Sequence, residues 1–207
     1  MGGFFGAVSR KNCKYDVFFG TDYHSHLGTK RGGLVIYDPE KGFSRQIHNI
    51  ENTPFRTKFE GDLAKMDGTA GIGCISDSDP QPLLVRSHLG MFAIATVGII
   101  NNAEDIVAKT FAAPGHYFMA MSSGKVNDNE LVAALINRCD NLIDGIKYAQ
   151  TLIEGTCTIL LLTPEGIIAA RDKLGRLPIV IGQNADGCCA AMESFACQKL
   201  GYTPRYN

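Results

Sequence analysis

The sequence lacks the features that mark nucleic-acid-binding, membrane-spanning or secreted proteins. Its 207 residues carry a formal net charge of −1, and no stripe of Lys and Arg supplies an electrostatic footprint for nucleic acid. No apolar run approaches the roughly 20 residues of a membrane-spanning helix. The opening residues also lack the basic region and apolar run of a signal peptide. These absences predict a cytoplasmic protein that binds neither nucleic acid nor membrane.

A disulfide framework and a metal site are equally missing from the pattern of cysteines. The chain has seven cysteines, an odd number, and their spacing is irregular. Cys188 and Cys189 are adjacent, so they would share a metal or a disulfide only with difficulty. We therefore predict reduced, mostly buried thiols, with no metal and no cofactor in this domain.

Repeats, low-complexity runs and linkers are absent too, so residues 1–207 are predicted to form one domain. Hydrophobic residues make up 45% of the chain, which is enough for a sizeable core. Apolar runs bounded by turn residues predict strands at residues 3–8, 33–37, 71–75, 83–85, 92–97, 157–162, 167–170, 178–181 and 188–192. Helical periodicity predicts helices at residues 16–27, 102–109, 127–135, 142–153 and 193–200. This order of strands, helices and strands predicts an α+β sandwich, in which helices cover sheets.

Three helix ends are predicted from cap residues. Gly28 is expected to end the first helix in a left-handed conformation. Asn102 is expected to cap the second helix, and Asn127 the third, where Glu130 lies at the capping-box position.

Several segments that run through almost the whole chain form a familiar pattern. They are residues 1–6 (MGGFFG), 26–28 (HLG), 71–73 (GIG), 81–84 (QPLL), 95–104 (ATVGIINNAE) and 166–178 (GIIAARDKLGRLP), followed by Glu193-Ser194. In this order they resemble the glutaminase domain of amidophosphoribosyltransferases and related class-II amidotransferases. The most specific segment is 166–178, which is similar to the family's G-x-x-A-x-R-D-x-x-G-x-R-P. The resemblance implies a four-layer αββα sandwich of the N-terminal-nucleophile hydrolase type.

The resemblance also implies a mechanism, and the nucleophilic sulfur atom of that mechanism is missing here. In the family, a cysteine at position two becomes the N-terminal residue, its thiol attacks the side-chain amide of glutamine, and ammonia leaves. This chain has Gly2 at that position. Glycine has no side-chain atom, so no acyl-enzyme can form there. Read without the family, Gly2 is simply a permissive residue at the start of a strand.

The matching oxyanion hole is only half present. The family uses the Asn and Gly of A-H-N-G, and this chain has Val97 and Gly98 instead. A backbone N–H survives while an amide donor is lost, which typically costs about 2.7–4 kcal/mol of transition-state stabilisation. Without the family, Val97 is expected to pack in a core strand and Gly98 to be a turn residue.

The residues that would hold the glutamine carboxylate are also replaced. The family's arginine matches Ser76, which Asp77 follows, so the bidentate partner is lost. Leu27 likewise replaces the arginine of His-Arg-Gly. Lys30 and Arg31 lie near in sequence, and two interpretations remain open: substitutes for the lost arginines, or solvated charges.

One substrate-binding acid remains at its expected place. Asp128 matches the family's aspartate that holds the α-amino group of glutamine. It also lies in the first turn of a predicted helix, where the helix dipole favours a carboxylate, and both interpretations stay open. Gly98 and Asp128 are thus the predicted vestigial substrate-binding residues, and no catalytic residue is predicted.

The resulting hypothesis is a glutaminase-inactive domain with a structural or regulatory role in an amidophosphoribosyltransferase-type protein of purine biosynthesis. We expect the chain to be truncated before its last strands and before a C-terminal phosphoribosyltransferase-like domain of the same parent, its predicted partner. A homo-oligomer is left open. Two alternatives also remain: a hydrolase that uses another nucleophile, such as Cys74 or Thr96, and a non-catalytic module that binds a metabolite.

Overall fold

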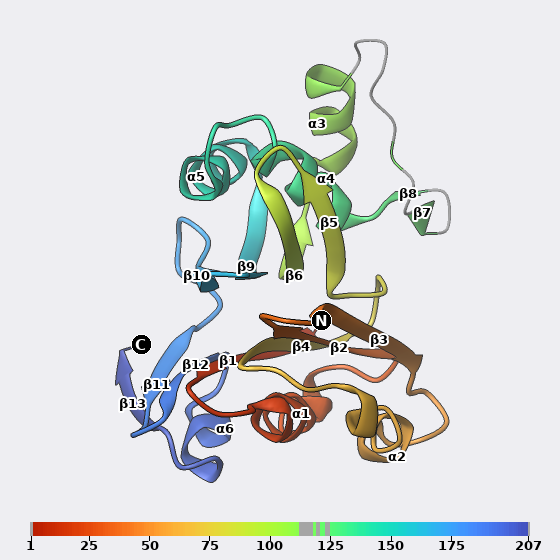
Figure 1. Ribbon diagram of the computed structural model, residues 1–207. Coiled ribbons are helices and arrows are strands. Elements are labelled where there is room, and N and C mark those ends of the chain that lie inside the picture. Colours follow the sequence, from red (N-terminus) through yellow and green to blue (C-terminus); the bar gives the residue numbers. More distant parts are fainter. Residues whose placement is uncertain (1, 112–117, 119–120, 123–124, 207) are drawn as a thin grey trace.

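Two main β-sheets stack face to face in the computed structural model, and helices cover the outer face of each sheet (Figure 1). The structure describes residues 2–111, 118, 121–122 and 125–206. This arrangement confirms the predicted αββα sandwich. Within the described ranges, no helix combines the length and the hydropathy that crossing a membrane requires.

The larger sheet has seven strands, and every neighbouring pair is antiparallel. In spatial order the strands are β13 (Thr203–Tyr206), β11 (Val180–Gln183), β12 (Gly187–Ala191), β1 (Gly2–Ser9), β4 (Ala70–Ser76), β2 (Arg31–Asp38) and β3 (Gly42–Asn49). Its outer face is covered by α1 (Lys14–Asp22), α2 (Phe55–Phe59) and α6 (Ser194–Lys199) (Figure 1). Two short 3₁₀ turns, η1 (Ser25–Leu27) and η2 (Leu63–Lys65), complete this half.

The smaller sheet has four strands, also antiparallel. In spatial order they are β10 (Gly166–Ala170), β9 (Gly155–Thr163), β6 (Gly90–Ile100) and β5 (Leu83–Ser87). Helices α3 (Ala103–Thr110), α4 (Asp128–Ile136) and α5 (Leu142–Leu152) lie on its outer side (Figure 1). A hairpin of β7 (Met121–Ser122) and β8 (Lys125–Val126) precedes α4.

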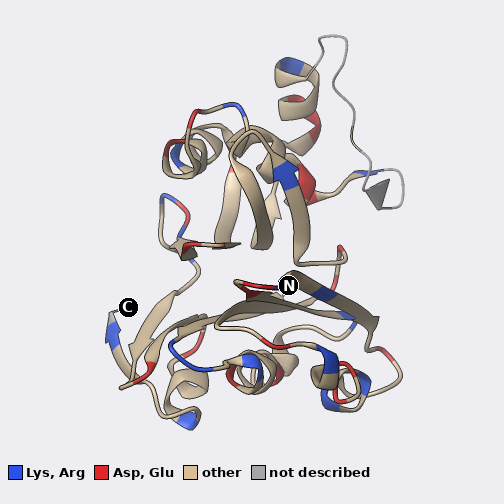
Figure 2. Ribbon diagram, in the orientation of Figure 1, with Lys and Arg blue, Asp and Glu red and all other residues tan. Residues whose placement is uncertain are grey.

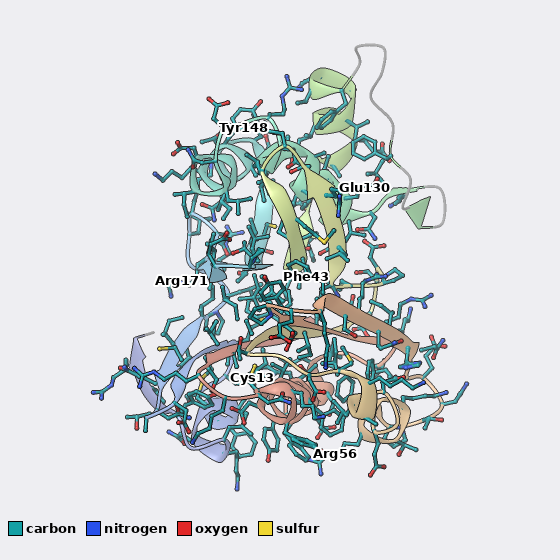
Figure 3. All side chains as sticks on the ribbon, viewed as in Figure 1. Cys13, Phe43, Arg56, Glu130, Tyr148 and Arg171 are labelled. Atoms are coloured by element: carbon teal, nitrogen blue, oxygen red, sulfur yellow. The ribbon has the colours of Figure 1, made fainter. Side chains whose placement is uncertain are left out.

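Alternation along the strands explains how one chain fills three apolar layers. Side chains on a strand point to opposite faces in turn, so Phe4 packs between the sheets while Phe5 packs under the helices beside α1. Leu160 on β9 contributes to the layer between the sheets, as does the partly buried Phe43 of β3 (Figure 3). Because strands such as β1 are buried on both faces, they appear in the sequence as continuous apolar runs.

Some local predictions were wrong. The first helix ends at Asp22 instead of continuing to residue 27, and Gly28 is extended, with φ −166°, instead of left-handed. Asn102 stands at the start of α3 but does not cap it. Its side chain instead donates to the carbonyl oxygen of Leu152 at 2.9 Å and accepts from the Glu154 N–H at 2.9 Å. The Asn102 side chain therefore makes tertiary hydrogen bonds in place of the expected N-cap hydrogen bond.

Candidate functional site

A cavity of about 910 Å³ opens where the edges of the two sheets meet helix α3 and the start of α4. Its lining includes the sequence-predicted positions Gly2, Gly98 and Asp128, together with Ser76, which pairs with Gly2 across β1 and β4. Gly2 is the first residue of β1, an inner strand of the larger sheet. Four segments far apart in the sequence thus meet around one cavity.

Gly2 lies in a backbone that leaves no room for a side chain. A Cβ atom built at this position would collide with the carbonyl oxygen of Ile75, and it would lie 3.4 Å from the Cα of Ser76. The colliding atom belongs to the neighbouring strand, so no side-chain rotation can relieve the contact. Glycine at position 2 is therefore required by close strand pairing as well as being chemically inert.

Gly98 is also required by the backbone. Its φ of +154° lies in the region that favours glycine, and a Cβ there would collide with the carbonyl oxygen of Thr156. Gly98 pairs with Cys157 inside the β6–β9 ladder, so its interpretation as a turn residue was wrong. Val97 is 5% exposed and packs between the sheets, which confirms its predicted place in a core strand.

Ser76 and Asp77 are both engaged in local hydrogen bonds. The Ser76 hydroxyl oxygen accepts the backbone N–H of Ser78 at 3.1 Å. The Asp77 carboxylate accepts the backbone N–H of Thr29 at 2.7 Å, and this hydrogen bond holds the pKa of Asp77 below its usual range. Lys30 and Arg31 are not among the residues that line the cavity.

Asp128 begins α4, and the helix start is well capped. The side-chain oxygen of Asn127 accepts the N–H groups of Asn129 at 2.8 Å and Glu130 at 3.2 Å, which confirms the predicted cap. The N–H of Asp128 donates to the Asp79 carboxylate at 3.1 Å. Burial, and then the charge of Asp79, raise the pKa of Asp128. The Asp79 carboxylate thus lies beside Asp128 at the start of α4, a contact that sequence reasoning missed because Asp79 lies in a polar loop.

A short polar network continues from these acids onto β6. The buried Gln81 side chain accepts the N–H of Thr96 at 2.8 Å, and the Thr96 hydroxyl donates to Asn129 at 3.1 Å. The Thr96 hydroxyl therefore donates to an amide oxygen, which cannot act as the base that a nucleophile needs.

The cysteines are also unsuited to catalysis at this cavity. All seven are free and five of them are buried, which confirms the predicted thiols. Cys74 is fully buried, burial raises the pKa of its thiol, and it does not line the cavity. A thiol held in its neutral form is a poor nucleophile.

Acidic side chains dominate the charge of the cavity. In the described part of the chain its lining holds four acids and one base: Glu104, Asp105, Asp128, Glu154 and Lys125. Figure 2 shows Asp and Glu on α3 and at the start of α4. No group of three or more His, Cys, Asp or Glu suited to a metal ion occurs among the described residues.

Comparison with known proteins gives the relationship of the chain. No protein-family model matches it. The amidophosphoribosyltransferase of Bacillus subtilis (strain 168) is 28% identical over 212 residues, which span 97% of this chain and 43% of that protein. The enzyme of the same name from Methanocaldococcus jannaschii is 27% identical and covers 97% of this chain and 44% of its own length. A solved structure, the B. subtilis glutamine phosphoribosylpyrophosphate amidotransferase complexed with ADP and GMP, superposes with a TM-score of 0.85 over 98% of this chain at 27% identity.

The chain is a homologue of the amidophosphoribosyltransferases. It spans less than half the length of these relatives. A second solved structure, described as the allosteric regulatory enzyme of purine biosynthesis, agrees equally well, with a TM-score of 0.85. The fold predicted from the amidophosphoribosyltransferase resemblance, the N-terminal-nucleophile hydrolase sandwich, is thereby confirmed.

Proposed function

We propose that this chain is a glutamine amidotransferase-like domain without glutaminase activity, with a structural or regulatory role in an amidophosphoribosyltransferase-type protein of purine biosynthesis. One observation carries the proposal. Position 2 offers neither a thiol nor the space for one, because the carbonyl oxygen of Ile75 lies where a side chain would begin. An acyl-enzyme needs a nucleophilic atom at this place in the cavity.

The remaining parts of the cavity support the same conclusion. The Val97 side chain packs in the apolar layer between the sheets. Valine has no amide group that could donate a hydrogen bond to an oxyanion. Ser76 replaces a carboxylate-binding arginine in the family pattern, and its hydroxyl is engaged by Ser78. Chemistry on glutamine would therefore lack a nucleophile, one oxyanion donor and the partner of the substrate carboxylate.

A partner domain is part of the proposal. More than half of each relative named above lies outside the region that matches this chain. We infer that a phosphoribosyltransferase-like domain of the same parent protein works beside this one. The reading frame that encodes the chain tests this, since a frame without such a domain contradicts it. A cytoplasmic location stays a prediction from the sequence.

Ammonia release from L-glutamine tests the loss of activity. The purified chain is incubated with glutamine, and ammonia is measured with a coupled dehydrogenase against a buffer blank. The B. subtilis amidophosphoribosyltransferase serves as the positive control. We expect the rate of the blank, and a rate clearly above it contradicts the proposal.

Labelling with an electrophilic glutamine analogue tests the alternative nucleophiles. Peptide mass spectrometry after labelling would reveal any covalent adduct. We expect none, since Cys74 is sealed in the core and Thr96 donates to Asn129. An adduct on either residue would support the alternative of a hydrolase with another nucleophile.

A further inference from the structure

Two cysteines form a buried pair on the outer side of the larger sheet. Cys189 lies on β12, and Cys197 lies on α6, which packs against β11, β12 and β13 at this end of the sheet (Figure 1). Cys197 is fully buried and Cys189 is 3% exposed. The Cys189 thiol donates to the Cys197 sulfur, and the two Sγ atoms lie 3.4 Å apart. An approach of about 1.4 Å would bring them to the S–S bond length of a disulfide.

The space around the two sulfur atoms depends on a glycine. Gly182 of β11 pairs with Cys189 across the sheet. A Cβ atom at position 182 would lie 2.8 Å from the Cys189 sulfur and 3.3 Å from the Cys197 Cβ, so a larger residue would displace the thiols. Both cysteines belong to the apolar cluster under the helices, and this packing holds them against each other.

The hydrogen bond between the thiols makes them chemically unequal. It lowers the pKa of Cys197, where it outweighs burial, and it raises the pKa of Cys189. The thiolate is the form of cysteine that a peroxide oxidises. Cys197 is therefore the sulfur that reacts first, and Cys189 is the thiol in contact with the product.

The neighbouring Cys188 differs from both members of the pair. It is exposed, and it points to the opposite face of β12 because side chains alternate along a strand. Adjacent cysteines also form a disulfide only with difficulty. Cys188 thus provides an internal comparison for the reactivity of the buried pair.

We propose that Cys189 and Cys197 form a reversible disulfide when the protein is exposed to hydrogen peroxide, and that this disulfide fixes α6 to β12. Transient disulfides of this kind serve as redox sensors in other proteins. Neither cysteine lines the cavity described above. The inference therefore goes beyond the proposed function and does not depend on it.

Hydrogen peroxide is the only oxidant that the reaction needs. The Cys197 thiolate attacks one peroxide oxygen, the O–O bond breaks, and hydroxide leaves as Cys197 becomes a sulfenic acid. Hydroxide takes up the proton that Cys197 had released. The Cys189 sulfur then attacks the sulfenic sulfur, the S–O bond breaks, and the Cys189 proton leaves with the oxygen as water. Two thiols are oxidised to one disulfide, and one peroxide is reduced to two molecules of water.

Peptide mass spectrometry tests the pairing. The folded chain is treated with a small excess of hydrogen peroxide, then denatured with N-ethylmaleimide and digested with trypsin. The tryptic peptide 177–199 contains Cys188, Cys189 and Cys197. We expect this peptide to lose two hydrogen atoms and to carry one maleimide label, which tandem spectra assign to Cys188. Labels on all three cysteines, or a disulfide that includes Cys188, overturn the inference.

Dithiothreitol and urea provide the controls. Reduction with dithiothreitol before alkylation should restore three labels, since a dithiol reverses a disulfide by exchange. Peroxide treatment in urea separates the fold from the short distance along the chain. We expect no preference for the Cys189–Cys197 bond in the unfolded chain. An equal preference there would show that sequence proximity alone selects the pair, and would overturn the inference.

Two matched variants locate the reaction. Cys188→Ser should still form the disulfide, and Cys197→Ser should lose it. Circular dichroism verifies that each variant is folded, and the mapping in the unchanged chain does not depend on either. Loss of the disulfide in folded Cys188→Ser would mean that the exposed thiol takes part, which contradicts the inference.

Urea unfolding tests whether the bond fixes α6 to β12. We expect a higher urea midpoint for the oxidised chain than for the reduced chain, because a disulfide restricts the unfolded chain. Peroxide should leave the midpoint of Cys197→Ser unchanged. An equal or lower midpoint for the oxidised chain would show that the bond strains the fold, and would overturn the inferred fixing of α6.

Discussion

Gly2 carries no thiol, and the strand around it leaves no space for a side chain. The missing thiol is visible in the sequence, whereas the missing space is visible only in the pairing of β1 with β4. A residue that lost only its reactive atom could recover it by one substitution. Gly2 could not, because the strand itself occupies the place of a Cβ.

The first prediction is that Gly2→Cys creates no glutaminase. We expect ammonia release at the rate of the parent chain, since a thiol enters only if β1 shifts away from Ile75. Gly2→Ala should lower the free energy of unfolding by about 1–3 kcal/mol, the usual cost of overpacking. Gly61→Ala is the control, because a Cβ there meets no atom within 4 Å. Glutamine-dependent ammonia release by Gly2→Cys would show that the strand yields easily.

The second prediction concerns His24 and pH. His24 is fully buried, its Nδ1 donates to the Gly20 carbonyl oxygen at 2.7 Å, and its Nε2 has no partner. Burial lowers the pKa of His24 below its ordinary value of 6.5. Below pH 6.5 His24 binds a proton in the unfolded chain but stays neutral in the folded chain. The contribution of neutral His24 to the free energy of unfolding is therefore fully present above the unfolded pKa. It is lost as pH falls from about 6.5 toward the folded pKa, by at most about 1.4 kcal/mol per pH unit.

Urea unfolding between pH 8 and pH 5 measures this effect. His24→Gln should flatten the decline in stability relative to the parent chain. His26→Gln is the control, since His26 is exposed and its replacement should leave the decline in place. Identical pH profiles for the parent and His24→Gln would refute the assignment.

At the scale of elements, asparagine has different roles at the starts of two helices. Asn127 caps α4, whereas Asn102 ties the start of α3 to the end of α5 and the beginning of β9. Helix propensity predicts a cap at both places. The segment that approaches Asn102 from elsewhere in the chain decides against it there.

The third prediction tests the α4 cap. Asn127→Ala should lower the free energy of unfolding by about 1 kcal/mol, within the usual range of 0.5–2 kcal/mol for a lost cap. Asn127→Asp retains an acceptor for the N–H groups of Asn129 and Glu130 and should cost less. Urea denaturation of the three proteins provides the comparison. Equal stability of Asn127→Ala and the parent would mean that packing alone holds the helix start.

At the scale of the whole molecule, the apolar layer between the sheets holds the two halves together. Leu160 of β9 and Phe4 of β1 are fully buried in this layer, and they come from opposite sheets. Strand β1 of the larger sheet contacts β6 of the smaller one across this layer, and Gly2 and Gly98 of these two strands line the same cavity.

The fourth prediction follows from this layer. Leu160→Ala should lower the free energy of unfolding by about 2–5 kcal/mol, because it removes buried methyl groups and leaves a cavity. Ile143→Ala is the control, since Ile143 is 48% exposed and should change stability by no more than about 0.5 kcal/mol. Thermal and urea unfolding measure both variants. A cost below 1 kcal/mol for Leu160→Ala would show that the layer collapses to fill the gap.

The strands and helices that the sequence predicted correctly are those with strong local hydrophobic patterns. The strands around Phe4, Ile72 and Leu160 are buried on both faces, so their apolar runs identify them. Strand β3 escaped prediction because it lies at a sheet edge and carries polar residues such as Arg45 and Gln46. The five-residue helix α2 is too short for a period to show.

The sequence by itself determined that position 2 carries no nucleophile, because the chemistry of a side chain belongs to its own residue. Its periodicity and turn residues also predicted sheets covered by helices, because these signals act over short stretches of chain, whereas the four-layer form was implied by the family resemblance. Only the tertiary structure decided that Ile75 closes the space beside Gly2 and that Asp79 lies against Asp128, 49 positions away. Such contacts depend on how strands pair and sheets stack. Strand pairing and sheet stacking join residues far apart in the sequence, and local sequence patterns do not predict these contacts.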